Sequence, residues 1–276
     1  MRIHQVHHLY QSRLDRATKP FNARGSKVVR CQFCQVTEKH CICSHQPNIQ
    51  SDIAALIIMS DNEILKPSNT GRLIADTLKD THAFQWSRTE PEQALLTLLK
   101  DDRYQPVIIF PEDYVDEKSR LIQVEDLVKQ EKLTEEALPK KQGIPKVQGI
   151  PKEVNSIPGK KPLLIFLDGS WREARKMFRK SDYLANLPVL SVNPDTVSNY
   201  MMRKSDNEKH LATAEVASLV INMLGDSNSA KILALWFEAF KEGYLLSKTR
   251  LKHDLSKPML AKYAEYTKNI EQRVAT

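Results

Sequence analysis

The sequence has no long hydrophobic run and few cysteines, and each shortage excludes a class of protein. No apolar stretch approaches the roughly 18 residues of a membrane span, and residues 1–16 offer no apolar segment for a secretory signal peptide. We therefore expect a cytoplasmic protein with no membrane partner. The four cysteines lie within a stretch of 13 residues. In a reducing compartment they are poor candidates for disulfides and better candidates for metal ligands.

Acidic residues are scarce at the start of the chain. Residues 1–46 hold eight Lys or Arg against two acids, a net charge of +6, whereas the whole 276-residue chain has +7. One zinc ion bound by four thiolates would leave this segment at +4. A basic segment of this kind suits a polyanion, and nucleic acid is the first candidate. A solvated basic tail without a partner is the alternative.

The cysteines have the spacing C-x2-C-x6-C-x-C, formed by Cys31, Cys34, Cys41 and Cys43. Two close pairs of thiolates can provide the tetrahedral ligand set that zinc prefers. The second pair departs from the common C-x2-C spacing, so His40 or His45 could replace one thiolate. Four protein ligands leave no open position, and we predict a structural zinc module rather than a catalytic metal.

Short apolar runs alternate with helical patterns after residue 50. The runs predict buried strands at 53–59, 107–110, 163–167 and 189–192. The periodic segments predict helices at 70–80, 91–101, 171–181, 213–224 and 231–249. This order indicates an α/β fold with a mostly parallel sheet flanked by helices. We expect three parts: a basic four-cysteine zinc module at 1–48, an α/β domain at 49–250, and a C-terminal tail at 251–276.

Residues 139–162 differ from their surroundings. They hold five of the 14 prolines and three of the eight glycines, and they repeat the sequence QGIPK. Such a segment cannot bury enough apolar surface to offset its ordering entropy. We predict a flexible surface insertion here. Its lysines could contact an RNA backbone.

The segment LLIFLDGSWREARKMF, residues 163–178, joins a buried strand to a basic helix. Ser170 and Glu173 form the pattern of a capping box, so an ordinary strand-to-helix turn is one interpretation. The other is a ligand site, because open α/β sheets bind ligands beyond the carboxyl ends of their strands. Asp168 ends such a strand, and Trp171 offers an aromatic face to a base or a cation.

Three further groups of residues could accompany that turn. The basic helix carries five cations against one acid, which suits RNA or a solvated helix face. In SNTGRL, residues 68–73, Asn69 or Thr70 could cap a helix, or together with Arg72 meet a phosphate or carboxylate. Residues 190–219 could form a second ligand edge through Ser191, Tyr200, Arg203 and Thr213.

Together these motifs resemble the DTW-domain family. The resemblance is carried by DGSW followed by EARKMF, SNTGRL before it, the Y-x2-R and T-x-E-[AV] elements after it, and the N-terminal cysteines. It covers about residues 13–250 outside the insertion, and it is strongest to bacterial tRNA-uridine aminocarboxypropyltransferases. The family signature is Asp-x-Thr-Trp. Ser170 replaces the threonine here and keeps the hydroxyl and the capping ability.

The resemblance implies transfer of the 3-amino-3-carboxypropyl group of S-adenosylmethionine to N3 of a uridine in tRNA. Bacterial members modify the variable loop and release methylthioadenosine. A fold similar to that of the SPOUT methyltransferases, with a knotted C-terminal part, is also implied. Two alternatives are a SPOUT-type RNA methyltransferase with the same cofactor, and a zinc-bearing RNA-binding protein without catalysis.

The resemblance also implies roles for individual residues. N3 of uridine must lose its proton, so a base is expected, and Asp168 is the candidate for this role or for orienting the amino acid end of S-adenosylmethionine. The expected catalytic residues are Asp168 and Trp171. The expected cofactor contacts are Asp168, Gly169, Ser170, Trp171, Ser191 and Thr213. The expected RNA contacts are Asn69, Thr70, Arg72, Arg175, Tyr200 and Arg203.

Overall fold

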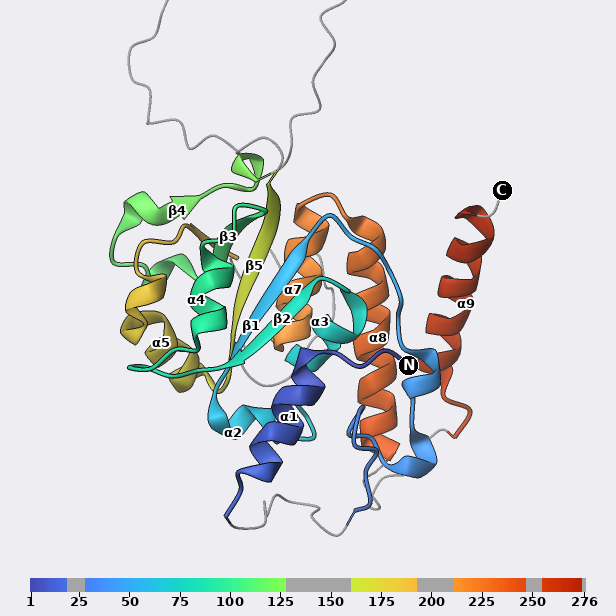
Figure 1. Ribbon diagram of the computed structural model, residues 1–276. Helices are drawn as coiled ribbons and strands as arrows, with labels where there is room; N and C mark the ends of the chain where they lie inside the picture. The colour runs from blue at the N-terminus through green and yellow to red at the C-terminus, as the bar shows by residue number, and fades with distance from the viewer. Residues whose placement is uncertain (19–27, 128–159, 193–210, 247–254, 275–276) are drawn as a thin grey trace, which may run out of the picture.

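A six-stranded, all-parallel sheet forms the centre of the protein (Figure 1). The computed structural model describes residues 1–18, 28–127, 160–192, 211–246 and 255–274. The strand order is β2-β1-β5-β3-β6-β4. The strands are β1 (Ala54–Met59), β2 (Thr81–Gln85), β3 (Tyr104–Ile109), β4 (Leu121–Ile122), β5 (Lys161–Asp168) and β6 (Val189–Leu190).

Helices cover both faces of this sheet. They are α1 (Gln5–Asp15), α2 (Asp61–Ile64), α3 (Gly71–Thr77), α4 (Gln93–Leu99), α5 (Trp171–Lys180), α7 (Thr213–Met223), α8 (Ser227–Leu246) and α9 (Pro258–Val274). Figure 1 shows α4 and α5 on one side of the sheet and α3, α7 and α8 on the other. The predicted α/β architecture, with a parallel sheet between helices, is therefore confirmed.

Alternation along the central strands divides the core into two layers. Ile57 and Phe166 pack in one layer with side chains of α3, α7 and α8. Ile58 and Ile165 pack in the other layer with side chains of α4 and α5. All six residues of β1 are buried, which explains its continuous apolar sequence, because a strand covered on both faces has no solvated side.

The strands that the sequence analysis missed are those at the sheet edges. β2 has the sequence THAFQ, and β4 is only two residues long. An edge strand is only partly buried, so its sequence lacks a continuous apolar run. The predicted strand 189–192 is shorter in the structure, where β6 contains only Val189–Leu190.

The two ends of the chain are integrated into the same core. Val6 of α1, Cys34, and Leu260 and Tyr263 of α9 all belong to the layer that contains α8. The segment predicted as a C-terminal tail therefore includes the helix α9. The hydroxyl of Tyr263 in this helix donates to the carbonyl of His45, 2.9 Å away. The predicted boundaries at 48 and 250 stay predictions.

Several expectations fall outside the described ranges. Most of the insertion 139–162 does, although its last two residues already belong to β5. Residues 193–210, between β6 and α7, lie outside them as well, so the knot stays a prediction. Within the described ranges, no helix combines the length and apolar character that crossing a membrane requires.

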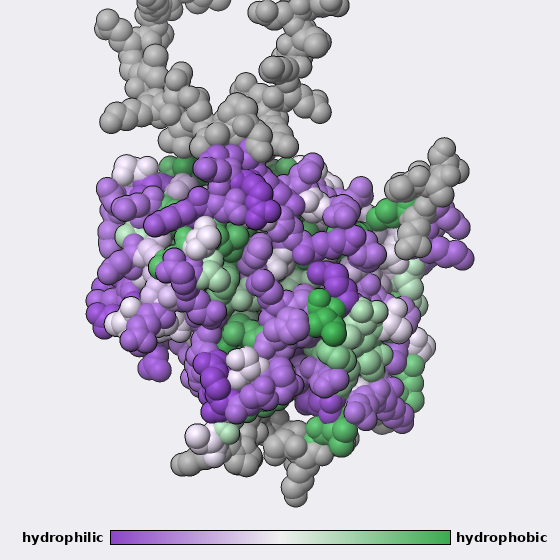
Figure 2. Space-filling view, in the orientation of Figure 1, coloured by the Kyte–Doolittle hydropathy of each residue, from purple (hydrophilic) through white to green (hydrophobic). Residues whose placement is uncertain are grey.

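The outer surface on the side shown in Figure 2 is largely hydrophilic. Apolar residues appear there as small separate patches rather than one broad area. Scattered apolar side chains are ordinary on a protein surface and do not indicate an interface.

Candidate active site

The sheet has a topological switch point between the carboxyl ends of β1 and β5. From β1 the chain crosses to β2 at one edge, whereas from β5 it crosses beyond β3 to β6 on the other side. Ligands of open α/β sheets bind in the crevice at such points. Met59 pairs with Asp168 at this position, and the amide of Ser60 donates to the Asp168 carbonyl over 2.9 Å. Asp168 therefore ends its strand at the switch point.

The carboxylate of Asp168 is held by two donors from separate elements. The hydroxyl of Thr213, at the start of α7, donates to Oδ1 over 2.6 Å. The side-chain amide of Asn69, just before α3, donates to Oδ2 over 2.5 Å. Asp168 is only 2% exposed. Both oxygens are thus oriented, and the carboxylate has little freedom to rotate.

Gly71 allows this arrangement because α3 approaches the carboxylate closely. A Cβ atom at Gly71 would lie 2.7 Å from Oδ2 of Asp168. This distance is shorter than any normal contact, so a side chain here would displace the carboxylate or the helix. The glycine of SNTGRL thus has a steric role that the sequence motif alone did not reveal.

The environment changes the acidity of Asp168. Burial, followed by the negative charge of Glu63, raises the pKa of Asp168 to about 6, although the hydrogen bonds from Thr213 and Asn69 act in the opposite direction. A carboxylate with this pKa is mostly ionised at neutral pH. It is also a stronger base than an ordinary aspartate.

A cleft of about 400 Å³ opens beside Asp168, at the ends of β3 and β5. Such a volume is within the range of clefts that bind small molecules. Asp168 itself is not among the lining residues, but Thr213 is, and its hydroxyl connects the wall of the cleft to the carboxylate. The lining residues are Ile109, Phe110, Pro111, Asp113, Tyr114, Phe166, Leu167, Gly169, Trp171, Ala174, Val192, Leu211, Thr213 and Val216.

Aromatic rings form one wall of the cleft. Trp171 stacks on Phe110, with ring centres 5.6 Å apart and planes 12° apart, and meets Tyr114 edge-on at 5.1 Å. Trp171 was predicted from the sequence as a site residue, whereas Phe110 and Tyr114 were not. These two residues follow β3, and their position after a buried strand was the available signal.

The turn that carries Trp171 is also an ordinary helix start. Ser170 accepts a hydrogen bond from the Glu173 amide, and its own amide donates to the Glu173 carboxylate over 2.8 Å. The capping box is therefore confirmed. Ser170 is exposed and is not among the cleft-lining residues.

The outer face of α5 is strongly basic. Its five cations are exposed, and no described acid forms an ion pair with any of them. A shallow hollow on this face is lined by Arg172, Arg175, Lys176, Arg179 and Lys180. Arg175 also lies over the ring of Tyr114, 4.8 Å from its centre, which connects this basic face to the wall of the cleft.

Other predicted site residues lie away from the cleft. Arg72 is 3% exposed, and its guanidinium donates to the carbonyl of Cys34, so RNA has no access to it. The expected RNA contact at Arg72 is therefore corrected. Asn69, 1% exposed, holds Asp168 and accepts from the Arg72 amide, which gives it a positioning and capping role.

Thr70 and Ser191 are also absent from the cleft lining. Thr70 precedes α3 without a capping hydrogen bond from its side chain. The hydroxyl of Ser191 accepts from the amide of Glu112 over 3.1 Å. Tyr200 and Arg203 lie outside the described residues.

Comparison with known families adds a decisive observation. The DTW domain matches residues 28–245, which is most of the chain. This chain belongs to the DTW domain family. Membership is consistent with a tRNA-modifying transferase. No solved structure matches the chain.

The DTW domain begins with the cysteine cluster. The Sγ atoms of Cys31 and Cys43 lie 3.6 Å apart, those of Cys34 and Cys41 lie 3.8 Å apart, and all four lie within 4.8 Å of one another. Four sulfurs around a tetrahedral zinc, with Zn–S bonds of about 2.3 Å, would be about 3.8 Å apart. The cluster therefore fits such an ion, and neither His40 nor His45 belongs to it.

A second group of potential ligands lies beside this cluster, formed by His4, His7 and Asp76. Its groups already have partners: Asp76 accepts from His4 at 3.0 Å and from the indole of Trp236 at 3.0 Å. The buried cation of Arg72 acts on both His7 and Asp76 and would oppose a metal ion. We interpret the group as a hydrogen-bond network that joins α1, α3 and α8.

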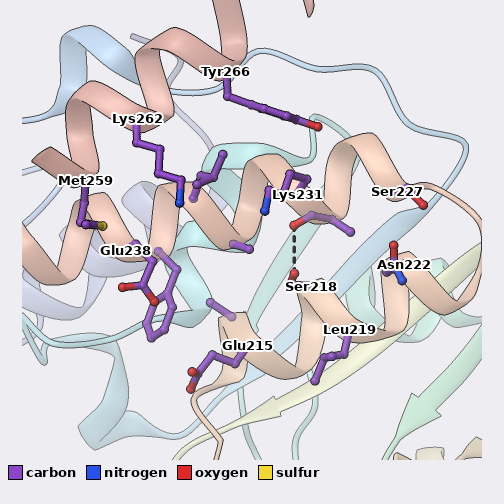
Figure 3. Close-up of a pocket in the computed structure, with 15 residues that line it drawn as sticks. Glu215, Ser218, Leu219, Asn222, Ser227, Lys231, Glu238, Met259, Lys262 and Tyr266 are labelled. Carbon is purple, nitrogen blue, oxygen red and sulfur yellow. Dashed lines mark hydrogen bonds between the residues drawn. The ribbon is translucent and has the colours of Figure 1, made fainter. Parts of the chain in front are cut away.

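A larger cavity, of about 620 Å³, lies between α7, α8 and α9 (Figure 3). Among the described residues, none from a strand end lines it, and Trp171 and Thr213 are absent from its lining. Lys231 and Lys262 extend into it from α8 and α9. Because chemistry in this fold class occurs at the strand ends, the candidate active site of the DTW domain is the smaller cleft.

Proposed function

We propose that this DTW-domain protein transfers the 3-amino-3-carboxypropyl group of S-adenosylmethionine to N3 of a uridine in tRNA, forming acp3U and releasing methylthioadenosine. The observation that carries the proposal is the buried Asp168 at the sheet switch point, held by Asn69 and by Thr213, which also lines the aromatic-walled cleft at the ends of β3 and β5. By resemblance to the bacterial members, the target is a uridine of the variable loop.

The cleft matches the two parts that the reaction brings together. The aromatic wall formed by Trp171, Phe110 and Tyr114 provides an apolar surface against which the adenine or uracil ring could pack, and aromatic rings also attract the positive sulfonium. Gly169 and Thr213 lie at the same rim. A uridine that leaves its stack could enter beside them, as in other enzymes that act on single bases.

Asp168 is the proposed base, and it acts through Thr213. The N3 proton passes to the Thr213 oxygen while the Thr213 hydroxyl proton passes to Asp168 Oδ1. The N3 electron pair then forms a bond to the methionine γ-carbon. The bond between that carbon and the sulfonium breaks, and sulfur keeps the electron pair. The site must therefore present the γ-carbon, rather than the methyl group, to N3.

The basic face of α5 supports an RNA substrate. The basic face of α5 has no described acidic partner and begins at the cleft. We propose that it holds the tRNA backbone, because a row of cations suits phosphates.

We also propose that the four cysteines bind one structural zinc ion, which would keep the N-terminal segment folded against α8.

Mass spectrometry tests the reaction directly. Unmodified tRNA is incubated with the protein and S-adenosylmethionine, and both the nucleosides and the small-molecule product are identified. The proposal predicts aminocarboxypropyl-uridine together with methylthioadenosine. A methylated nucleoside with S-adenosylhomocysteine would instead indicate a methyltransferase. Intact tRNA binding without a product would indicate an RNA-binding protein.

A further inference from the structure

Arg72 is a buried cation, and the strongest opposite charge acting on it is Asp76 of the same helix, with which it forms no ion pair. Its guanidinium donates to the carbonyls of Cys34 at 3.1 Å and Pro67 at 3.4 Å, and its Cζ lies 5.4 Å from the centre of the Phe240 ring. Its Nε has no hydrogen-bond partner, and no carboxylate forms an ion pair with it among the described residues. Burying a charge is unfavourable unless an opposite charge lies nearby.

The cysteine cluster can add a second opposite charge to that of Asp76. Four thiolates around one divalent zinc ion have a net charge of −2. The Arg72 guanidinium contacts this cluster directly, through its hydrogen bond to the Cys34 carbonyl. Groups that contact metal ligands in this way orient the ligands and tune the affinity for the metal.

The other end of the same turn reaches the candidate active site. The backbone amide of Arg72 donates to Oδ1 of Asn69 over 3.0 Å, and Nδ2 of Asn69 donates to Asp168 over 2.5 Å. Gly71 packs directly on the Asp168 carboxylate. One four-residue turn, Asn69 to Arg72, therefore contacts the cysteine cluster at one side and Asp168 at the other.

We propose that Arg72 is a positioning residue that couples metal binding at the four cysteines to the orientation of Asp168. With metal bound, the dianionic cluster holds the guanidinium against Cys34, and the turn keeps Asn69 on the carboxylate. Loss of the metal removes the negative charge of the cluster and leaves only that of Asp76, so the guanidinium is held less firmly against Cys34 and the turn releases Asn69. The consequence for catalysis rests on the proposed function, whereas the coupling itself does not.

The first experiment measures metal affinity by competition between a chelator and the Co²⁺-loaded protein, followed through the cobalt–thiolate absorption. Arg72→Met is expected to weaken Co²⁺ binding by about 10- to 100-fold, the usual effect of removing a group that supports metal ligands. Arg72→Lys keeps the charge and should recover part of the loss. Arg30→Met is the matched control, since Arg30 donates to the Gln35 carbonyl in the same loop and lies over Tyr244 without joining α3.

The second experiment records the side-chain amide signals of Asn69 by NMR in zinc-loaded protein, with Asn69→Ala identifying them. In Arg72→Met these signals should move toward those of a free amide, while Arg30→Met leaves them unchanged. Unchanged Co²⁺ affinity or unmoved Asn69 signals in folded Arg72→Met would overturn the coupling. Absence of tRNA modification by the wild-type protein would overturn only the proposed function, because neither readout depends on turnover.

Discussion

At the scale of single residues, Asp168 combines burial with two fixed hydrogen bonds. We expect Asp168→Asn to lower the transfer rate by at least about 10²-fold, the usual contribution of a general base. Affinity for tRNA should change little, since the carboxylate lies below the surface. Single-turnover kinetics and filter binding measure the two quantities separately. An equal loss of rate and affinity would contradict the proposed role.

Two controls separate chemistry from folding in that test. A raised folded-state pKa means that Asp168 stabilises the fold below about pH 4 and loses this contribution as the pH rises through about 6. Asn at this position should therefore leave the melting temperature at pH 7 unchanged or higher.

Thr213→Val should reduce the rate, whereas Thr213→Ser keeps the hydroxyl and most of the activity.

The same pKa predicts the pH dependence of the reaction. The base acts in its ionised form, so kcat/KM should rise with pH through about 6 and level off above it. Rates measured from pH 5 to 8 with saturating S-adenosylmethionine test this. A rate that stays constant from pH 5 to 8 would contradict a base with the raised pKa of Asp168.

At the scale of elements, α5 carries like charges three and four residues apart, and each such pair destabilises a helix by about 0.2–0.5 kcal/mol. Replacing Arg172, Arg179 and Lys180 by Gln should therefore not unfold it. We expect weaker tRNA binding, with the slope of log K against log salt reduced by about 2 to 3. Lys231→Gln with Lys262→Gln, in the larger cavity, is the control and should leave the slope unchanged.

The elements also show where sequence patterns succeed. The helices α3, α4, α5, α7 and α8 and the strands β1, β3 and β5 were predictable, because each carries a periodic or continuous apolar pattern. The edge strands β2 and β4 were not, since pairing with a neighbour rather than burial defines them. The packing of α9 was not predicted, because its buried side chains Leu260 and Tyr263 stand among polar residues in the sequence.

At the scale of the whole molecule, Asp76 joins α1, α3 and α8. Burial alone would raise its pKa, but hydrogen bonds from His4 and Trp236 and the charge of Arg72 lower it to about 2. A carboxyl with a lowered folded-state pKa stabilises the fold above its unfolded value, near 4, and this contribution is lost as the pH falls toward 2. Wild-type stability should therefore decrease over that range.

Removing the carboxylate tests this contribution. Asp76→Ala leaves the buried donors of His4 and Trp236 unpaired, and each costs about 1–3 kcal/mol. Urea unfolding at pH 7 should show a loss of about 2–6 kcal/mol, and the decrease between pH 4 and 2 should become shallower. Asp101→Ala is the control, because Asp101 forms an ion pair with Arg103 at the surface and should contribute little.

The sequence by itself determined the alternation of strands and helices, the capping box at Ser170 and the cysteine spacing, because these depend on neighbours a few residues apart. Only the tertiary structure decided that Arg72 faces the cysteines rather than RNA, that Gly71 packs on Asp168, and that Phe110 and Tyr114 line the cleft. These contacts join residues far apart in the chain. Local patterns cannot specify them, because the order of the strands in the sheet brings them together.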